Sequence, residues 1–223
     1  VMSGSYADPL LDVSSVKYVI VPLVDDMNDD NFFIHYGLTR DEYITLLNDM
    51  PFLEKKELGL SEIVVYENKN FNPHAYLTKE KNVLSGNEKN IQIEFTQKKS
   101  TEYYFRVKNV DSPFFLNFSE SYNAGWKIGL GNFSWSNALF KQQYANPDKN
   151  HFSNFGNLNS FYIDPELFCR SMEECARDSD NSYSFDGTIY FLPQAYLIFG
   201  GIVSGTIFTI LIFSFLYFMI KNK

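Results

Sequence analysis

The residues best suited to chemistry in this chain are carboxylates, and two of them stand in apolar or aromatic segments. Glu120 lies in FSESYNAGWK and Asp164 lies in FYIDPE. Two carboxylates can hydrolyse a glycosidic bond when they flank it at a fixed separation. The chain has 27 Asp and Glu residues, and nothing in their spacing fixes such a separation. We therefore interpret both as solvated acids and expect no catalytic residue in this segment.

The thiols and imidazoles give a second set of candidates. Cys169 and Cys175 are the two cysteines, and His35, His74 and His151 are the three histidines. The histidines are not at ligand spacing, so we expect neither a metal nor a cofactor. A catalytic thiol would need a histidine partner, which sequence cannot identify. A local disulfide is favoured for an exported domain and requires any helix between the two cysteines to break. Free thiols in the core are the alternative.

The charge of the chain limits its partners. The formal net charge is −8 at pH 7 and the isoelectric point is near 4.9. Binding to a phosphate backbone needs a basic face, and none is visible in the sequence, so nucleic acid is excluded as a partner. Anionic lipid headgroups are disfavoured for the same reason.

An apolar segment near the C-terminus predicts a membrane helix over 193–220. No charged residue occurs from Ala195 to Ile220, a run long enough to cross a hydrocarbon core of about 30 Å as a helix. Lys221 and Lys223 follow it, and by the positive-inside rule they predict a cytoplasmic tail over 221–223 and an extracytoplasmic domain.

Small residues within this predicted helix suggest a packing face. Gly201 and Gly205 form a G-x-x-x-G pattern, which lets a second membrane helix approach closely. The alternative is that glycine is simply common in membrane helices.

Residues 1–72 predict a small α/β domain. The run Val13–Leu23 is apolar and β-branched and predicts a buried strand. Thr39 and Glu42 form a capping box that predicts a helix over residues 41–49. Two further strands are expected over 52–58 and 62–66, on either side of Gly59.

Residues 73–192 predict an antiparallel β-sandwich of the jelly-roll kind, with short strands separated by turn residues. A helical insertion is expected near 164–177, because Asp164 is a good N-cap and Pro165 suits the first helical position. The predicted fold class is therefore α+β and mostly β, with a small α/β layer, a sandwich and one C-terminal transmembrane helix. The expected strands are 92–95, 102–107, 113–119, 125–130 and 188–192.

Five segments together resemble the C-terminal part of polytopic membrane glycosyltransferases of the GT-C type, including YfhO-like and arabinofuranosyltransferase-like groups. They occur in the family's order from about residue 11 to the C-terminus. The sequence departs from the family pattern where His74 replaces Arg, Ala124 replaces Pro, and Asn159-Ser160-Phe161 replaces Asn-Gly-Trp. The segments are LDVSSVKYVIVP (11–22), IVVYENKNFNPHAYL (63–77), DSPFFLNFSESYNAGWK (111–127), NFGNLNSFYIDPELFC (154–169) and IYFLPQAYLIFGGIVSG (189–205).

The resemblance implies an exported, non-catalytic region that follows a multi-helix catalytic module. The parent protein would transfer a sugar from a polyprenyl-phosphate donor to a cell-surface glycan, and this region would support or bind the acceptor. Its partners would be membrane lipid, upstream transmembrane helices of the same protein and the glycan. Aromatic faces stack on sugar rings and charged tips bond hydroxyls, so a sugar surface would use Glu120, Tyr122, Trp126, Lys127 and Trp135.

Three alternatives stay open at this point. Tyr122 and Trp126 are also suited to a core around a turn at Asn123-Ala124-Gly125. The chain could be a single-pass surface module with a binding or structural role and no enzymatic role. It could also be a cytoplasmic domain held by a tail anchor.

Overall fold

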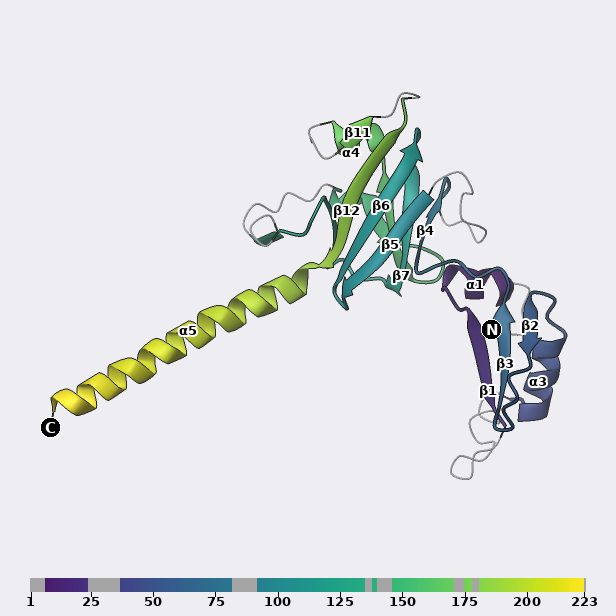
Figure 1. Ribbon diagram of the computed structural model, residues 1–223, viewed down its shortest axis with the longest axis horizontal. Helices are drawn as coiled ribbons and strands as arrows, with labels where there is room; N and C mark the ends of the chain where they lie inside the picture. Colours follow the sequence, from purple (N-terminus) through teal and green to yellow (C-terminus); the bar gives the residue numbers. More distant parts are fainter. Residues whose placement is uncertain are drawn as a thin grey trace. The chain divides into compact units, whose positions relative to one another are not determined.

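Most elements of this chain are antiparallel β strands, which form three sheets (Figure 1). The computed structural model describes residues 7–23, 37–81, 92–134, 138–139, 146–170, 175–177 and 181–222. The chain divides into two compact units, which we describe separately. The first comprises Val1–Asn90, Pro113–Tyr122 and Phe152–Tyr162, and the second comprises Ile91–Ser112, Asn123–His151 and Ile163–Lys223.

The described residues of the first unit include a three-stranded sheet with the order β1-β3-β2 and the helices α1 and α3. One face of this sheet packs on the helices, where Leu47, Val64 and Tyr66 are buried. The Tyr66 hydroxyl donates to Asn48 Oδ1 at 2.9 Å, so the ring is held against the helix by packing and by a hydrogen bond. The elements are α1 (Ala7–Val13), β1 (Tyr18–Pro22), α3 (Arg40–Asn48), β2 (Leu53–Lys56) and β3 (Ile63–Asn68).

The helix α3 begins as the sequence predicts. The Thr39 hydroxyl accepts from the Glu42 backbone N–H, and the Glu42 carboxylate accepts from the Thr39 backbone N–H at 2.8 Å. This reciprocal capping box satisfies two backbone donors that a helix terminus leaves without intrahelical partners. The predicted N-cap is confirmed.

The predicted buried strand Val13–Leu23 needs correction. Val13 ends α1, and β1 begins only at Tyr18. Within β1 only Val21 is buried, while Tyr18 and Ile20 are 48% and 59% exposed. The reason is that β1 lies at an edge of the sheet, where one face of the strand has no covering layer.

Most of a four-stranded antiparallel sheet also belongs to the first unit, with the order β4-β7-β10-β9. Every residue of β4 is buried, as are Phe114, Leu116 and Phe118 of β7. The alternation along β7 is that of a strand with one face in a core. The strands are β4 (Ala75–Thr78), β7 (Phe114–Ser121), β9 (His151–Ser153) and β10 (Leu158–Ile163).

The second unit is built around β12, which pairs with three other strands. Its neighbours are β6 on one side and β11 and β8 on the other, and β5 continues the sheet beyond β6. Phe105, Ile128 and Ile189 are fully buried in it. The strands are β5 (Gln92–Lys99), β6 (Glu102–Val110), β8 (Trp126–Leu130), β11 (Cys175–Arg177) and β12 (Tyr183–Phe191).

The predicted helical insertion contains a short helix, α4 (Pro165–Cys169). The Asp164 carboxylate accepts from the backbone N–H groups of Glu166 and Leu167, as expected of an N-cap before a helix with proline in its first turn. The helix does not extend to the predicted end near 177, because Cys175–Arg177 is a strand of the sheet.

The C-terminal element is a 30-residue helix, α5 (Leu192–Lys221), which starts directly after β12. In the described part of the chain it is the helix long and apolar enough to span a membrane. The expected fold class, α+β and mostly β with a long apolar C-terminal helix, is confirmed. The sandwich arrangement and the boundaries 1–72, 73–192 and 193–220 stay predictions.

Candidate functional site

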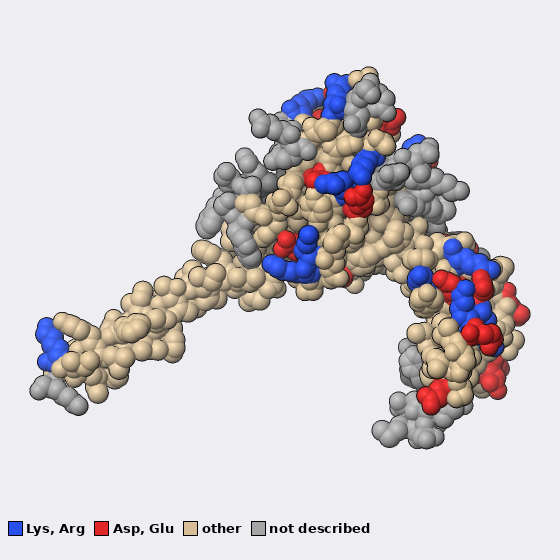
Figure 2. Space-filling view, in the orientation of Figure 1, with Lys and Arg blue, Asp and Glu red and all other residues tan. Residues whose placement is uncertain are grey.

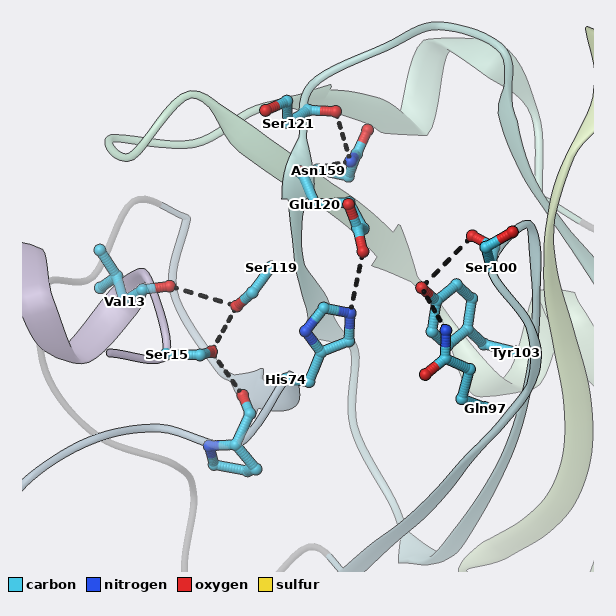
Figure 3. Close-up of polar contacts among 11 residues, drawn as sticks. Val13, Ser15, His74, Gln97, Ser100, Tyr103, Ser119, Glu120, Ser121 and Asn159 are labelled. Carbon is cyan, nitrogen blue, oxygen red and sulfur yellow. Dashed lines mark hydrogen bonds and ion pairs between the residues drawn. The ribbon is translucent and has the colours of Figure 1, made fainter. Parts of the chain in front are cut away.

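A histidine and a glutamate come together in the first unit, beside the end of β7. His74 Nε2 lies 3.4 Å from Glu120 Oε1, and both side chains are 39% exposed (Figure 3). The pairing of β4 with β7 brings the two side chains together. The Ser119 backbone N–H donates to the His74 carbonyl at 2.9 Å, and Glu120 is the residue after Ser119. The imidazole also packs edge-on against Phe118, 5.1 Å away. The pair therefore places an imidazole, which can bind and release a proton, beside a carboxylate, and both side chains are partly exposed to solvent.

Partial burial lowers the pKa of His74 below its usual 6.5, and the Glu120 carboxylate acts more weakly in the opposite direction. The folded protein therefore holds a neutral imidazole at pH values where the unfolded chain binds a proton. Stability must then fall as the pH drops below about 6.5, because the unfolded state gains protons first.

We expect His74→Gln to flatten this part of the stability profile. Urea unfolding of the full chain in detergent micelles between pH 5 and pH 7 should show a smaller loss of stability for the variant than for the wild type. The difference between the two curves isolates His74 from other groups that titrate. Parallel curves would show that His74 has the same pKa in both states.

A serine bridge fixes the chain beside this pair. Ser15 has a positive φ of 58°, and its hydroxyl donates to the Pro73 carbonyl at 2.9 Å. The same hydroxyl lies 2.5 Å from the Ser119 hydroxyl (Figure 3). The bridge ties the turn after α1 to the residue before Glu120 and to the residue before His74.

A buried asparagine supports Glu120 from β10. The Asn159 amide is fully buried and donates to the Glu120 carbonyl at 2.7 Å and to the Ser121 carbonyl at 3.2 Å (Figure 3). Its neighbours Ser160 and Phe161 are both 1% exposed. This segment, where the sequence departs from the glycosyltransferase pattern, therefore has a structural role in the sheet.

The expected sugar-contacting residues are divided between the two units. Glu120 and Tyr122 belong to the first unit, and Tyr122, just after β7, is 36% exposed. Trp126 and Lys127 belong to β8 in the second unit. Trp135 lies outside the described residues.

Trp126 is 7% exposed, with its ring 5.1 Å from Phe191 and 5.9 Å from Tyr103. A ring covered by other aromatic rings has no free face for a sugar, so the core interpretation of Trp126 holds. Lys127 is also largely covered and forms an ion pair with Asp148. Of the expected surface, Glu120 and Tyr122 are the accessible members among the described residues.

The two cysteines are joined by a disulfide, with their Cα atoms 5.6 Å apart. Cys169 is the last residue of α4 and Cys175 is the first residue of β11, so the helix does break between them. The ring of Phe168 packs 5.1 Å from Phe185 of β12. The bridge and this contact attach the insertion to the sheet of the second unit, which contains β11 and β12.

Gly201 and Gly205 both lie on α5, and a Cβ atom added at either would meet nothing within 4 Å. The helix-packing role expected of them stays a prediction.

Sequence reasoning singled out Glu120 but missed its pairing with His74. The two residues are 46 positions apart, and only the register of β4 on β7 brings them together. Among the residues that the structure describes, no group of three or more His, Cys, Asp or Glu side chains could hold a metal ion. No protein-family model, curated protein or solved structure matches this chain.

Proposed function

We propose that this chain is a membrane-anchored extracytoplasmic module that supports glycan assembly and leaves the chemistry to another part of its protein. The observation that carries the proposal is the junction at residue 191. Strand β12 ends at Phe191 and the apolar helix α5 begins at Leu192, so the β domain joins the helix without a linker. A helix of this composition is stable in lipid because its backbone groups, apart from those of the first and last turns, bond within it.

Two features support an extracytoplasmic position. A disulfide persists in oxidising compartments and is rare in the cytoplasm. Lys221 and Lys223 follow the helix, whereas the approach to it, residues 187–192, has no basic residue.

The glycosyltransferase role rests on the resemblance of the five segments. On this proposal the parent protein uses a polyprenyl-phosphate sugar donor, and this module positions or binds the acceptor glycan. The half-exposed pair of His74 and Glu120, with Tyr122 two residues after Glu120, offers hydrogen-bonding groups and an aromatic ring to a sugar.

The second candidate is a single-pass surface module with a binding or structural role. The observation in its favour is that the described residues include one helix suited to crossing a membrane. The reading frame upstream of Val1 distinguishes the two. Further hydrophobic segments in frame support the glycosyltransferase proposal, and a start codon followed by a signal peptide supports the single-pass module.

Titration of the full chain in micelles with cell-surface oligosaccharides tests acceptor binding. We expect Glu120→Gln to weaken binding about tenfold, since a hydrogen bond to a charged group contributes about 1.5–3 kcal/mol. Glu57→Gln is the control, because Glu57 is an exposed carboxylate of the first unit away from the pair. If the wild type binds no oligosaccharide, the acceptor-binding role is wrong.

Loss of the disulfide should destabilise the second unit. We expect Cys169→Ser combined with Cys175→Ser to lower the free energy of unfolding by about 2 kcal/mol, because the bridge closes a short loop. Urea unfolding of the oxidised wild type, the reduced wild type and the double variant gives the comparison. Reduction should shift the wild type to the variant's midpoint. An unchanged midpoint would mean that the bridge does not stabilise the fold.

A further inference from the structure

The turn between β5 and β6 lies at the point where α5 begins. The Phe191 backbone N–H donates to the Thr101 carbonyl at 2.9 Å, and the Leu192 N–H donates to the Gly125 carbonyl at 2.9 Å. The Tyr103 hydroxyl closes the turn by donating to the Ser100 carbonyl at 3.4 Å (Figure 3). The β5–β6 turn is thus hydrogen-bonded to the last residue before the helix.

The tyrosines of α5 indicate how deep the helix enters a bilayer. Tyr196 and Tyr217 are about 32 Å apart at about 1.5 Å per residue, close to the hydrocarbon thickness of about 30 Å. Tyrosine favours both membrane interfaces, so this spacing places one ring at each boundary. Phe191 then lies about 8 Å outside the boundary, within the headgroup layer, which is about 5–8 Å thick on each side.

The β5–β6 turn also has the chemistry that a headgroup layer favours. Lys98 and Lys99 end β5, and Ser100 is exposed between the strands. Lys99 Nζ lies 3.5 Å from Glu102 and its side chain is 66% exposed, while Lys98 Nζ lies 5.8 Å from the centre of the Tyr104 ring. Figure 2 shows charged side chains gathered where the sheet meets α5, and an uncharged surface along the helix beyond them.

We propose that residues 98–101 lie in the lipid headgroup layer and that Lys98 and Lys99 bind phospholipid phosphates. This inference rests on the proposed membrane anchoring. It also revises the expectation that an acidic chain avoids anionic headgroups. Charges interact across about a Debye length, near 8 Å at physiological salt, so the two lysines at the junction act on the lipid more than the net charge does.

Depth measurements on the reconstituted full chain test the position of the turn. Because Cys169 and Cys175 are bridged, a single introduced cysteine is the one free thiol to label. Ser100→Cys reports on the turn, Ser112→Cys reports on the opposite end of β6, and Ser204→Cys reports on the middle of α5.

We expect a nitroxide on the lipid headgroup to quench the label at position 100 strongly and the label at position 112 weakly, since β6 separates them by about 27 Å. A nitroxide on the acyl chain should quench the label at position 204. If the label at position 204 is quenched but the label at position 100 is quenched no more than the label at position 112, the inference about the turn is wrong and the membrane anchoring still holds. No quenching at 204 would overturn the membrane anchoring itself.

Charge removal tests the phosphate contact. We expect Lys98→Gln combined with Lys99→Gln to reduce the preference of the reconstituted protein for spin-labelled phosphatidylglycerol over phosphatidylcholine about fivefold. Lys55→Gln combined with Lys69→Gln makes the same charge change at exposed positions of the first unit and should leave the preference unchanged. An unchanged preference in the Lys98/Lys99 variant would overturn the proposed lipid contact.

Discussion

Replacing Gly187 with alanine should lower the free energy of unfolding of the second unit by about 3 kcal/mol, the upper part of the usual range for an overpacked core. A Cβ atom at Gly187 would lie 2.2 Å from Cζ of Phe105 and 2.6 Å from its Cε1. The two residues face each other across β12 and β6, and Phe105 is fully buried. The ring therefore has no room to move away from an added methyl group.

A matched glycine on the neighbouring strand provides the control. A Cβ atom at Gly129 of β8 would meet its nearest neighbour, Tyr190, at an ordinary 3.7 Å. Gly129→Ala should leave the free energy of unfolding within about 0.5 kcal/mol of the wild type, as expected for a substitution that causes no clash. Urea unfolding of both variants in micelles measures the difference.

A second substitution identifies the cause of the Gly187 effect. Phe105→Leu shortens the side chain that fills the space over Gly187, and combined with Gly187→Ala it should be less destabilising than the sum of the two single changes. A purely additive result would show that the clash with Phe105 is not the reason. The pair matters for the proposed membrane anchor because β12 continues directly into α5.

Local signals explain which parts of the fold the sequence predicted well. Capping at Thr39 and Asp164 depends on residues within three positions of each other, and both caps are present. The apolar run that forms α5 is likewise a local property. Strands β5, β6, β7, β8 and β12 all overlap expected ones because their apolar residues recur with the strand period.

Non-local packing explains what the sequence could not predict. The strand β10 has a mixed sequence, LNSFYI, whose polar Asn159 and Ser160 are buried because they bond to β7. Sequence favoured β1 as a buried strand, but its place at an edge leaves Ile20 exposed. The His74–Glu120 pair depends on the register of two strands, which no local pattern specifies.

Trp126 is the residue whose role changes most once the fold is known. It begins β8 opposite Phe191, the last residue of β12, and the two rings are 5.1 Å apart. The preceding Gly125 permits the close approach of α5, since a Cβ atom there would lie 2.8 Å from Cδ of Pro193. Trp126 therefore helps to hold the sheet against the start of the helix.

Trp126→Ala should lower the free energy of unfolding by about 3–5 kcal/mol, the range for truncating a buried aromatic residue. Tyr122→Ala, at the 36% exposed tyrosine, should change it by less than about 1 kcal/mol. Urea unfolding of the two variants gives the comparison. Trp126→Phe should recover part of the loss, because a smaller ring still contacts Phe191 and Tyr103. If Trp126→Ala instead left stability unchanged and abolished oligosaccharide binding, the ring would be a sugar platform and its burial in the core would be wrong.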